Sequence, residues 1–226
     1  MNSVYKVNVI HETPAERRKK AQEARILDAA LAIVAEGGLD ALSIKAIAER
    51  ADYSPAALYR YFASKDELVA ALAIRAVRTL GEALAEVDAC APPLSRVTWL
   101  ARRFVDFAHE DAARFGLIHV LLAEPRVLVD EPKLVGEVLA AVMEVLAPLA
   151  TALAEAAERR QLAPGDASER ALLLATSLLG LLLLRKQASR LPRALELDDL
   201  ARKQVETMLR GFGAPERALA TIAWRV

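Results

Sequence analysis

Three helix-start signals lie close together near the amino terminus, and their spacing constrains the fold more than any other feature of the sequence. Ser43 and Ser54 suit the N-cap position, and Pro55 directly after Ser54 suits the first turn of a helix. Ser64 and Glu67 have the spacing of a capping box. Each of the first two helices therefore has room for only about two turns before the next signal. The sequence predicts two short helices joined by a tight turn and followed by a longer helix.

Another helix is predicted before this pair. Thr13-Pro14-Ala15-Glu16 combines an N-cap threonine, a proline at the first helical position and a capping-box glutamate. Apolar residues then recur with the helical period of 3.6 until Gly37-Gly38 ends the segment. Residues 13–80 therefore contain four predicted helices, and we expect residues 1–12 to form a flexible arm.

The rest of the chain also has the pattern of an all-α protein. Ala, Leu, Glu and Arg dominate, and no β-branched run alternates with period two. Pro148 predicts a kink inside the longest helix. Longer apolar-periodic stretches predict the remaining helices at residues 94–109, 111–122, 133–160, 171–184 and 197–210.

Composition excludes several classes of protein. The 30 Lys and Arg balance 30 Asp and Glu, so the chain is not globally basic, and 54% hydrophobic residues exclude a disordered chain. Cys90 is the one cysteine, and His11, His109 and His119 lack the spacing of zinc ligands, so we expect no disulfide, metal or cofactor.

The same reasoning places the chain in the cytoplasm. The uncharged run at residues 171–184 is shorter than the roughly 20 residues needed to cross a bilayer. The first ten residues lack the charged start and apolar core of a secretory signal. We therefore expect a cytoplasmic protein without a membrane segment. The all-round apolar run must still be covered, either in the core or by a second copy of the chain.

The two short helices form a predicted helix-turn-helix, whose second helix can enter the major groove of double-stranded DNA. Ala56 and Ala57 leave the first turn of that helix slim enough to approach base edges. Tyr59, Arg60 and Tyr61 offer hydrogen-bond donors beside it. The alternative interpretation is a short core connector with half-buried tyrosines.

The residues of this region resemble a known family. The stretches Ile26-Leu-Asp-Ala-Ala-Leu, Ser43-Ile-Lys-Ala-Ile-Ala-Glu-Arg-Ala51, Ser54-Pro-Ala-Ala-Leu-Tyr-Arg-Tyr-Phe62 and Ser64-Lys-Asp-Glu-Leu68 are similar to the DNA-binding domain of the tetracycline-repressor (TetR) family of bacterial transcriptional regulators. The resemblance covers about residues 22–73. It implies a homodimer that binds a palindromic operator, and a helical C-terminal domain that dimerises and binds a small-molecule effector. We accordingly expect domains at residues 13–74 and 75–226.

The resemblance also implies roles for single residues. Ser43 and Lys45 match positions that touch DNA at the start of the first short helix. Tyr59, Tyr61 and Lys65 match phosphate-binding positions. The full predicted DNA-binding set is Ser43, Lys45, Ser54, Pro55, Ala56, Ala57, Tyr59, Arg60, Tyr61 and Lys65.

Two features of this region leave alternatives open. Family members usually carry glycine and then an aliphatic residue in the turn, where this chain has Asp52 and Tyr53. Asp tolerates the left-handed conformation, whereas Tyr53 must either fill a hole or point outward. The basic run at residues 17–20 either reaches DNA or forms a solvated helix face. Through Asp66 the chain has 10 basic and 9 acidic residues, so DNA affinity must come from the placement of charge.

The second domain shows no arrangement typical of an enzyme, because it lacks a phosphate loop and a nucleophile elbow. A mainly apolar pocket is predicted among Trp99, Phe104, Phe107, Phe115, His119 and Met143. The alternative for the aromatic residues among them is ordinary core packing. A dimer interface is predicted at Leu179, Leu183 and Val205. The alternatives are an architectural DNA-binding dimer without a ligand and a helical-bundle enzyme. The sequence does not distinguish repression from activation.

Overall fold

The computed structural model describes residues 13–123, 131–190, 196–220 and 222–224. These residues form ten α-helices and two 3-10 helices, so the all-α prediction is confirmed. The chain divides into two compact units, and the boundary between them falls between Leu68 and Val69. The predicted arm at residues 1–12 and most of the predicted loop before Pro132 lie outside the described residues.

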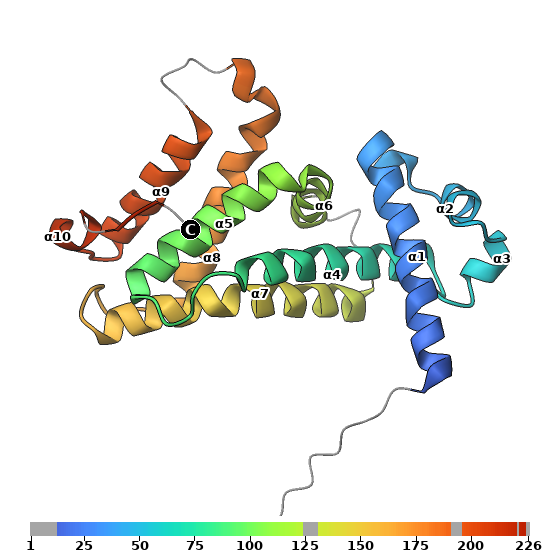
Figure 1. Cartoon of the computed structure of the whole chain (residues 1–226), viewed down its shortest axis with the longest axis horizontal. Helices are drawn as coiled ribbons and strands as arrows, with labels where there is room; N and C mark the ends of the chain where they lie inside the picture. Colours follow the sequence, from blue (N-terminus) through green and yellow to red (C-terminus); the bar gives the residue numbers. More distant parts are fainter. Residues whose placement is uncertain (1–12, 124–130, 191–195, 221, 225–226) are drawn as a thin grey trace, which may run out of the picture. The chain divides into compact units, whose positions relative to one another are not determined.

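The first unit contains a long helix and the two short ones. Its elements are α1 (Pro14–Gly37), the 3-10 helix η1 (Leu39–Ala41), α2 (Ile44–Ala51), α3 (Pro55–Leu58) and the start of α4 (Lys65–Leu84). Thr13 and Glu16 form the predicted capping box of α1. Helix α2 packs against both α1 and α3, and these two short helices lie on the same side of α1 (Figure 1). Ile26, Ile47 and Leu58 form its buried centre.

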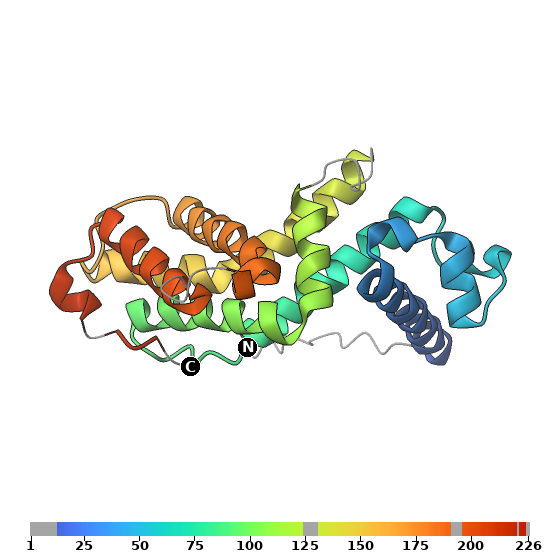
Figure 2. The same ribbon diagram turned by 90° about the horizontal axis from the view of Figure 1, so that it is seen from above.

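The second unit continues α4 and adds the larger helices. They are α5 (Pro93–Glu110), α6 (Ala112–Ala123), α7 (Pro132–Glu158), α8 (Ala167–Leu182), η2 (Leu183–Arg190, a 3-10 helix), α9 (Leu197–Gly211) and α10 (Glu216–Leu219). Helix α8 packs against α5, α7 and α9, and Figure 2 shows α8 in orange beside the redder α9. Pro148 lies inside α7, as predicted.

Helix α8 has three distinct faces. Ala171, Leu174, Leu178 and Leu182 recur at helical spacing and are at most 1% exposed, so they form the core face. Leu172, Thr176, Leu179 and Leu183 form a second stripe, which lines a cavity. Leu173, together with Leu184 near the start of η2, falls on a third stripe, and the two leucines are 47% and 42% exposed.

Helix α7 and the segment Ala167–Arg185, which contains the uncharged run at residues 171–184, are both long and strongly apolar. Stretches of α7 and of Ala167–Arg185 have mean hydropathies of 1.7 and 1.6, so each is long and apolar enough to cross a membrane by length and composition alone. Only 22% of each stretch is buried. The helix that contains the uncharged run is thus longer than the run itself, although core helices of soluble proteins have the same length and composition. The uncovered apolar side chains still require a cover.

Other differences from the predicted elements are local. Helix α3 is a single turn, not two, because Arg60 and Tyr61 donate backbone hydrogen bonds three residues back, to Ala57 and Leu58. The helical path nevertheless reaches Phe62, whose N–H donates to the Leu58 carbonyl at 3.0 Å. The sequence patterns did not predict η2 or α10.

Candidate functional site

The three serines fix the ends of the helices around the candidate DNA interface. The Oγ atoms of Ser43, Ser54 and Ser64 accept hydrogen bonds from the backbone N–H groups of Ala46, Ala57 and Glu67 at 3.1, 3.2 and 3.0 Å. A cap of this kind stabilises a helix by about 1 kcal/mol. Each hydroxyl keeps its own proton, which remains available to donate to a phosphate oxygen.

The N-terminal turn of α3 is open to solvent. Pro55 and Ala56 are exposed, and Ala57 is half-buried behind them. Leu58 is 1% exposed and anchors the turn to the core. This division leaves two small side chains facing outward at the end of a helix, where a base edge can approach closely.

Polar and cationic groups surround that turn. Tyr59 is 52% exposed, and Arg60 and Lys65 are also exposed. Within the described residues, no carboxylate pairs with either cation. Lys45 on α2 is exposed, and its Nζ lies 3.9 Å from Glu49 Oε1. An exposed ion pair at this distance contributes little to stability. These side chains can exchange water for phosphate oxygens without breaking a strong internal bond.

Tyr61 differs from the other predicted DNA-binding residues. Its hydroxyl is hydrogen-bonded to Gln22 Oε1 on α1, and its ring packs edge-on against Tyr53 with centroids 6.0 Å apart. Tyr61 therefore ties the turn to α1, and we remove it from the proposed phosphate contacts. Of the two alternatives for Tyr53, filling a hole or pointing outward, the structure supports the first, because this half-buried ring packs beside Tyr61.

The turn between α2 and α3 is closed by backbone geometry. Asp52 adopts the left-handed conformation, with φ 62° and ψ 47°. Tyr53 N–H donates to the Ala48 carbonyl at 2.9 Å, which completes a helix-ending motif that normally uses glycine. Arg50 also bonds both oxygens of Glu36, which clamps α2 onto α1 and lowers the pKa of that carboxyl.

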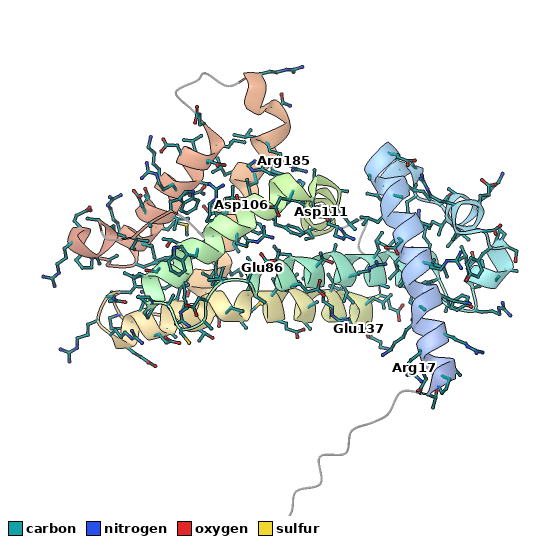
Figure 3. All side chains as sticks on the ribbon, in the orientation of Figure 1. Arg17, Glu86, Asp106, Asp111, Glu137 and Arg185 are labelled. Atoms are coloured by element: carbon teal, nitrogen blue, oxygen red, sulfur yellow. The ribbon has the colours of Figure 1, made fainter. Side chains whose placement is uncertain are left out.

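The basic run at residues 17–20 lies in the first turns of α1. Its side chains are exposed, and Lys19 pairs with Glu23 at 3.7 Å. Figure 3 labels Arg17 near the start of this helix. The run therefore has the geometry of a solvated face and is equally available to DNA.

The second unit contains a cavity of about 450 Å³. Its wall is built from α4, α5, α6, α7, α8 and the first residue of η2. Phe104, His119 and Met143 from the predicted pocket lie on this wall. Trp99, Phe107 and Phe115 do not, so the predicted pocket must be corrected. The indole of Trp99 donates to the Ala223 carbonyl, and Phe107 and Phe115 are core residues.

Most of the cavity wall consists of aliphatic residues that the sequence reasoning missed. Val77 and Leu80 come from α4, and Leu139 and Val145 come from α7. A second space of about 50 Å³ lies next to it and shares several wall residues, Phe104 among them. The helical period alone could not identify these residues, because leucines that face a cavity and leucines that face the core have the same spacing.

Two polar side chains lie on this wall. Thr176 uses its proton internally, since its hydroxyl donates to the Leu172 carbonyl at 2.7 Å. His119 Nδ1 is buried without a hydrogen-bond partner. Burial and, to a smaller degree, the charge of Arg185 lower the pKa of His119, so its imidazole is neutral at pH 7.

Of the predicted dimer residues, Val205 needs correction. Leu179 and Leu183 lie on the cavity wall, and Val205 is 0% exposed in the core of its own chain. The run was apolar all round, so periodicity could not assign its stripes. The exposed stripe with Leu173 and Leu184 has no apolar cover within the described part of the second unit.

Comparisons with known proteins agree with this geometry. The family described as bacterial regulatory proteins, tetR family, matches residues 26–72. The transcriptional repressor KstR of Mycolicibacterium smegmatis is 45% identical over 78 residues, which are 34% of this chain and 32% of KstR. The regulator BetI of Rhizobium meliloti is 36% identical over 104 residues, or 42% of this chain and 47% of BetI. The chain thus matches less than half the length of these curated relatives.

Solved structures extend the likeness to nearly the whole chain. RolR in complex with resorcinol has a TM-score of 0.65 at 22% identity, and the match covers 93% of this chain and 98% of RolR. The regulatory protein SCO4313 has a TM-score of 0.66 at 28% identity, covering 88% of this chain and all of that one. The match of residues 26–72 to a family of regulators agrees with the prediction that the chain is not an enzyme. Residues 26–72 thus match the DNA-binding domain of the tetR family of bacterial regulatory proteins.

Proposed function

We propose that this protein is a transcriptional repressor that binds a palindromic operator as a homodimer and releases it when a small, mainly apolar molecule occupies the second unit. The observation that carries the DNA-binding part is the exposed turn of α3, flanked by Tyr59, Arg60 and Lys65. We place the protein in the cytoplasm, where its DNA lies.

The cavity favours a ligand-responsive regulator over an architectural DNA-binding dimer. A volume of about 450 Å³ is within the range of small-molecule sites, and its wall is nearly all apolar. RolR, which shares the fold, has been solved with resorcinol. An unfilled apolar space of this size lowers stability, so a purely architectural protein has no use for it.

The cavity also offers a route to the DNA-binding unit. Val77 and Leu80 line the cavity from α4, the helix that begins at Lys65 in the first unit. A ligand that prefers the non-binding arrangement by a hundredfold shifts the equilibrium by about 2.7 kcal/mol. Displacement of α4 by the ligand is therefore sufficient to change operator affinity.

The DNA-binding part is tested on a duplex selected from a random library by the purified protein. Fluorescence anisotropy over a range of salt concentrations then compares wild type with Lys65→Ala and Arg60→Ala. Loss of one phosphate contact should weaken binding to all sequences and lower the salt slope by about one unit. Lys133→Ala, an exposed lysine of the second unit, is the matched control and should change neither quantity. Unchanged slopes in both test variants would remove these residues from the interface.

The allosteric part is tested separately on the same duplex. The complex is titrated with apolar compounds that a thermal-shift screen identifies as ligands. Release of DNA supports ligand-controlled repression. Ligands that fill the cavity and leave operator affinity unchanged would contradict ligand-controlled release and leave the DNA-binding part standing.

A further inference from the structure

Arg185, in η2, is a partly buried cation. Its guanidinium lies over the Phe115 ring, 4.5 Å from the centroid, and donates to the carbonyls of Ala112 and Leu182 at 3.2 and 3.5 Å. No carboxylate pairs with it in the described part of the chain. Arg96 and Arg102, also partly buried in this unit, both bond carboxylates. Figure 3 labels Arg185 beyond the end of α8.

Arg185 and His119 share one corner of the second unit. Ala112, Phe115 and His119 recur on α6 at helical spacing, and Arg185 contacts the first two of them. Its charge also reaches His119, where it adds to burial in lowering the imidazole pKa. Burial lowers the pKa of Arg185 as well. The corner therefore holds a guanidinium that no carboxylate among the described residues balances, and an imidazole whose Nδ1 has no hydrogen-bond partner.

The space next to this corner is apolar. The larger cavity carries His119 on its wall, and the smaller one, which shares several wall residues with it, is lined also by Leu84, Leu100 and Leu149. A molecule that fills both spaces must be a hydrocarbon body with its polar end beside His119. Burying a charge without a partner is costly, and a ligand that supplies the missing charge recovers that cost.

We propose that the ligand of this cavity is an amphipathic carboxylate whose hydrocarbon body occupies the two apolar spaces and whose anionic end lies between His119 and Arg185. This inference rests on the proposed ligand-controlled function and names its ligand class. The carboxylate balances the charge of Arg185 and accepts a hydrogen bond from His119. A neutral alcohol provides no counter-charge, and an ammonium group is repelled by the guanidinium.

The proposal is tested with decanoate, decan-1-ol and decylamine, whose bodies are the same and whose end groups differ. Direct binding to the full chain is measured by calorimetry below the aggregation concentration of each probe. Decanoate should bind at least tenfold more tightly than decan-1-ol, and decylamine should not bind. Arg185→Gln should abolish the preference for decanoate without weakening decan-1-ol, whereas Arg185→Lys should retain part of it.

Arg170 provides a matched control. It also stacks on a ring, that of Phe212 at 5.0 Å, and donates to backbone carbonyls, but at the turn before α8. Arg170→Gln should leave the preference for decanoate intact. Thermal melts confirm that each variant is folded before its binding is compared.

Two outcomes would overturn the proposal: equal affinities for decanoate and decan-1-ol, or an Arg185→Gln variant that keeps the full preference. These results are separable from failure of the proposed function. If decan-1-ol binds as tightly and releases the operator, ligand control stands and only the anionic class is wrong. If decanoate binds through Arg185 without releasing the operator, the ligand class stands and ligand control is wrong.

Discussion

At the scale of single residues, the turn of the helix-turn-helix depends on an aspartate where glycine is usual. Asp52 has φ 62°, a conformation that costs an L-residue free energy and that Asp tolerates better than most. Tyr53 compensates in part, because its ring packs against Tyr61 and adds apolar and ring contacts to the turn.

Replacing Asp52 with glycine should therefore stabilise the first unit. We expect the free energy of unfolding to rise by up to about 1 kcal/mol, because glycine adopts this φ without steric cost. Asp52→Asn is the control, since it removes the same charge and keeps a side chain that tolerates the conformation. Urea denaturation of both variants measures the difference. A glycine variant no more stable than the asparagine variant would show that the left-handed turn carries no strain here.

Residue patterns in the sequence predicted contacts only where both partners are close in the chain. The caps of Ser43, Ser54 and Ser64 form as predicted because each bonds a backbone group three residues away. The pairing of Tyr61 with Gln22 was missed, because the two residues are distant in sequence and meet only when α3 folds against α1.

At the scale of elements, an ion pair between a buried arginine and a more exposed glutamate joins α5 to α7. Arg96 is 8% exposed and bonds Glu155, which lies on α7. The hydrogen bond from Arg96 is the main cause that lowers the pKa of Glu155 below its ordinary value of 4.5. Because the folded-state pKa is the lower one, the pair stabilises the fold above the unfolded-state pKa. That contribution is lost as the pH falls through the folded-state pKa.

Glu155→Gln should accordingly be less stable than wild type at pH 7, and the gap should close as the pH falls below about 4.5. Protonation of Glu155 removes from wild type the same charge that the variant lacks. Glu158→Gln, an exposed position on the same helix, is the control and should give a smaller gap. The measurement is the free energy of unfolding of wild type and both variants from pH 7 to pH 3. A gap independent of pH would mean that the carboxylate charge contributes nothing.

The contact between α4 and α7 depends on a glycine. A Cβ at Gly81 would lie 3.0 Å from Val145 Cγ2, and Val145 lines the cavity. Gly81→Ala gains about 1 kcal/mol of helix propensity and should keep the fold, while Val145 is pushed toward the cavity. We expect weaker binding of decanoate and decan-1-ol alike, measured by calorimetry.

Gly136→Ala on α7 is the matched control, because a Cβ there meets no atom within 4 Å. It should gain similar stability and leave ligand binding unchanged. Equal effects on binding from both variants would show that the α4–α7 contact is not coupled to the cavity.

The helices themselves were largely predictable, whereas the roles of their faces were not. Periodicity and caps predicted α8, but Leu173, Leu174 and Leu179 are chemically alike and lie on three different faces. Only packing against α5, α7 and α9 distinguishes the core face from the cavity face and the exposed stripe. For that reason the sequence located the helices of the second domain and could not assign the faces of α8.

At the scale of the whole molecule, the chain is electrically neutral and presents uncovered leucines. The 30 cations and 30 anions exclude a general electrostatic attraction to DNA. Affinity must therefore come from the local placement of charge, and in the proposed homodimer two copies of the helix-turn-helix bind at once. Two helix-turn-helix units of a dimer meet successive major grooves when they are about 34 Å apart, or a multiple of that distance. A homodimer thus accounts both for operator binding and for the exposed apolar stripe of α8.

The final prediction concerns that stripe. Leu173→Glu combined with Leu184→Glu should convert the dimer to a monomer in analytical ultracentrifugation without detergent, because two carboxylates would be buried without partners. Leu139→Glu is matched in exposure at 51% but lies on the cavity wall, so it should remain dimeric and lose ligand binding. If instead Leu139→Glu dissociates the protein and the double variant does not, the interface covers the cavity. A wild-type protein that stays dispersed only in detergent would mean that lipid, and not a second copy, covers the apolar faces of α7 and α8.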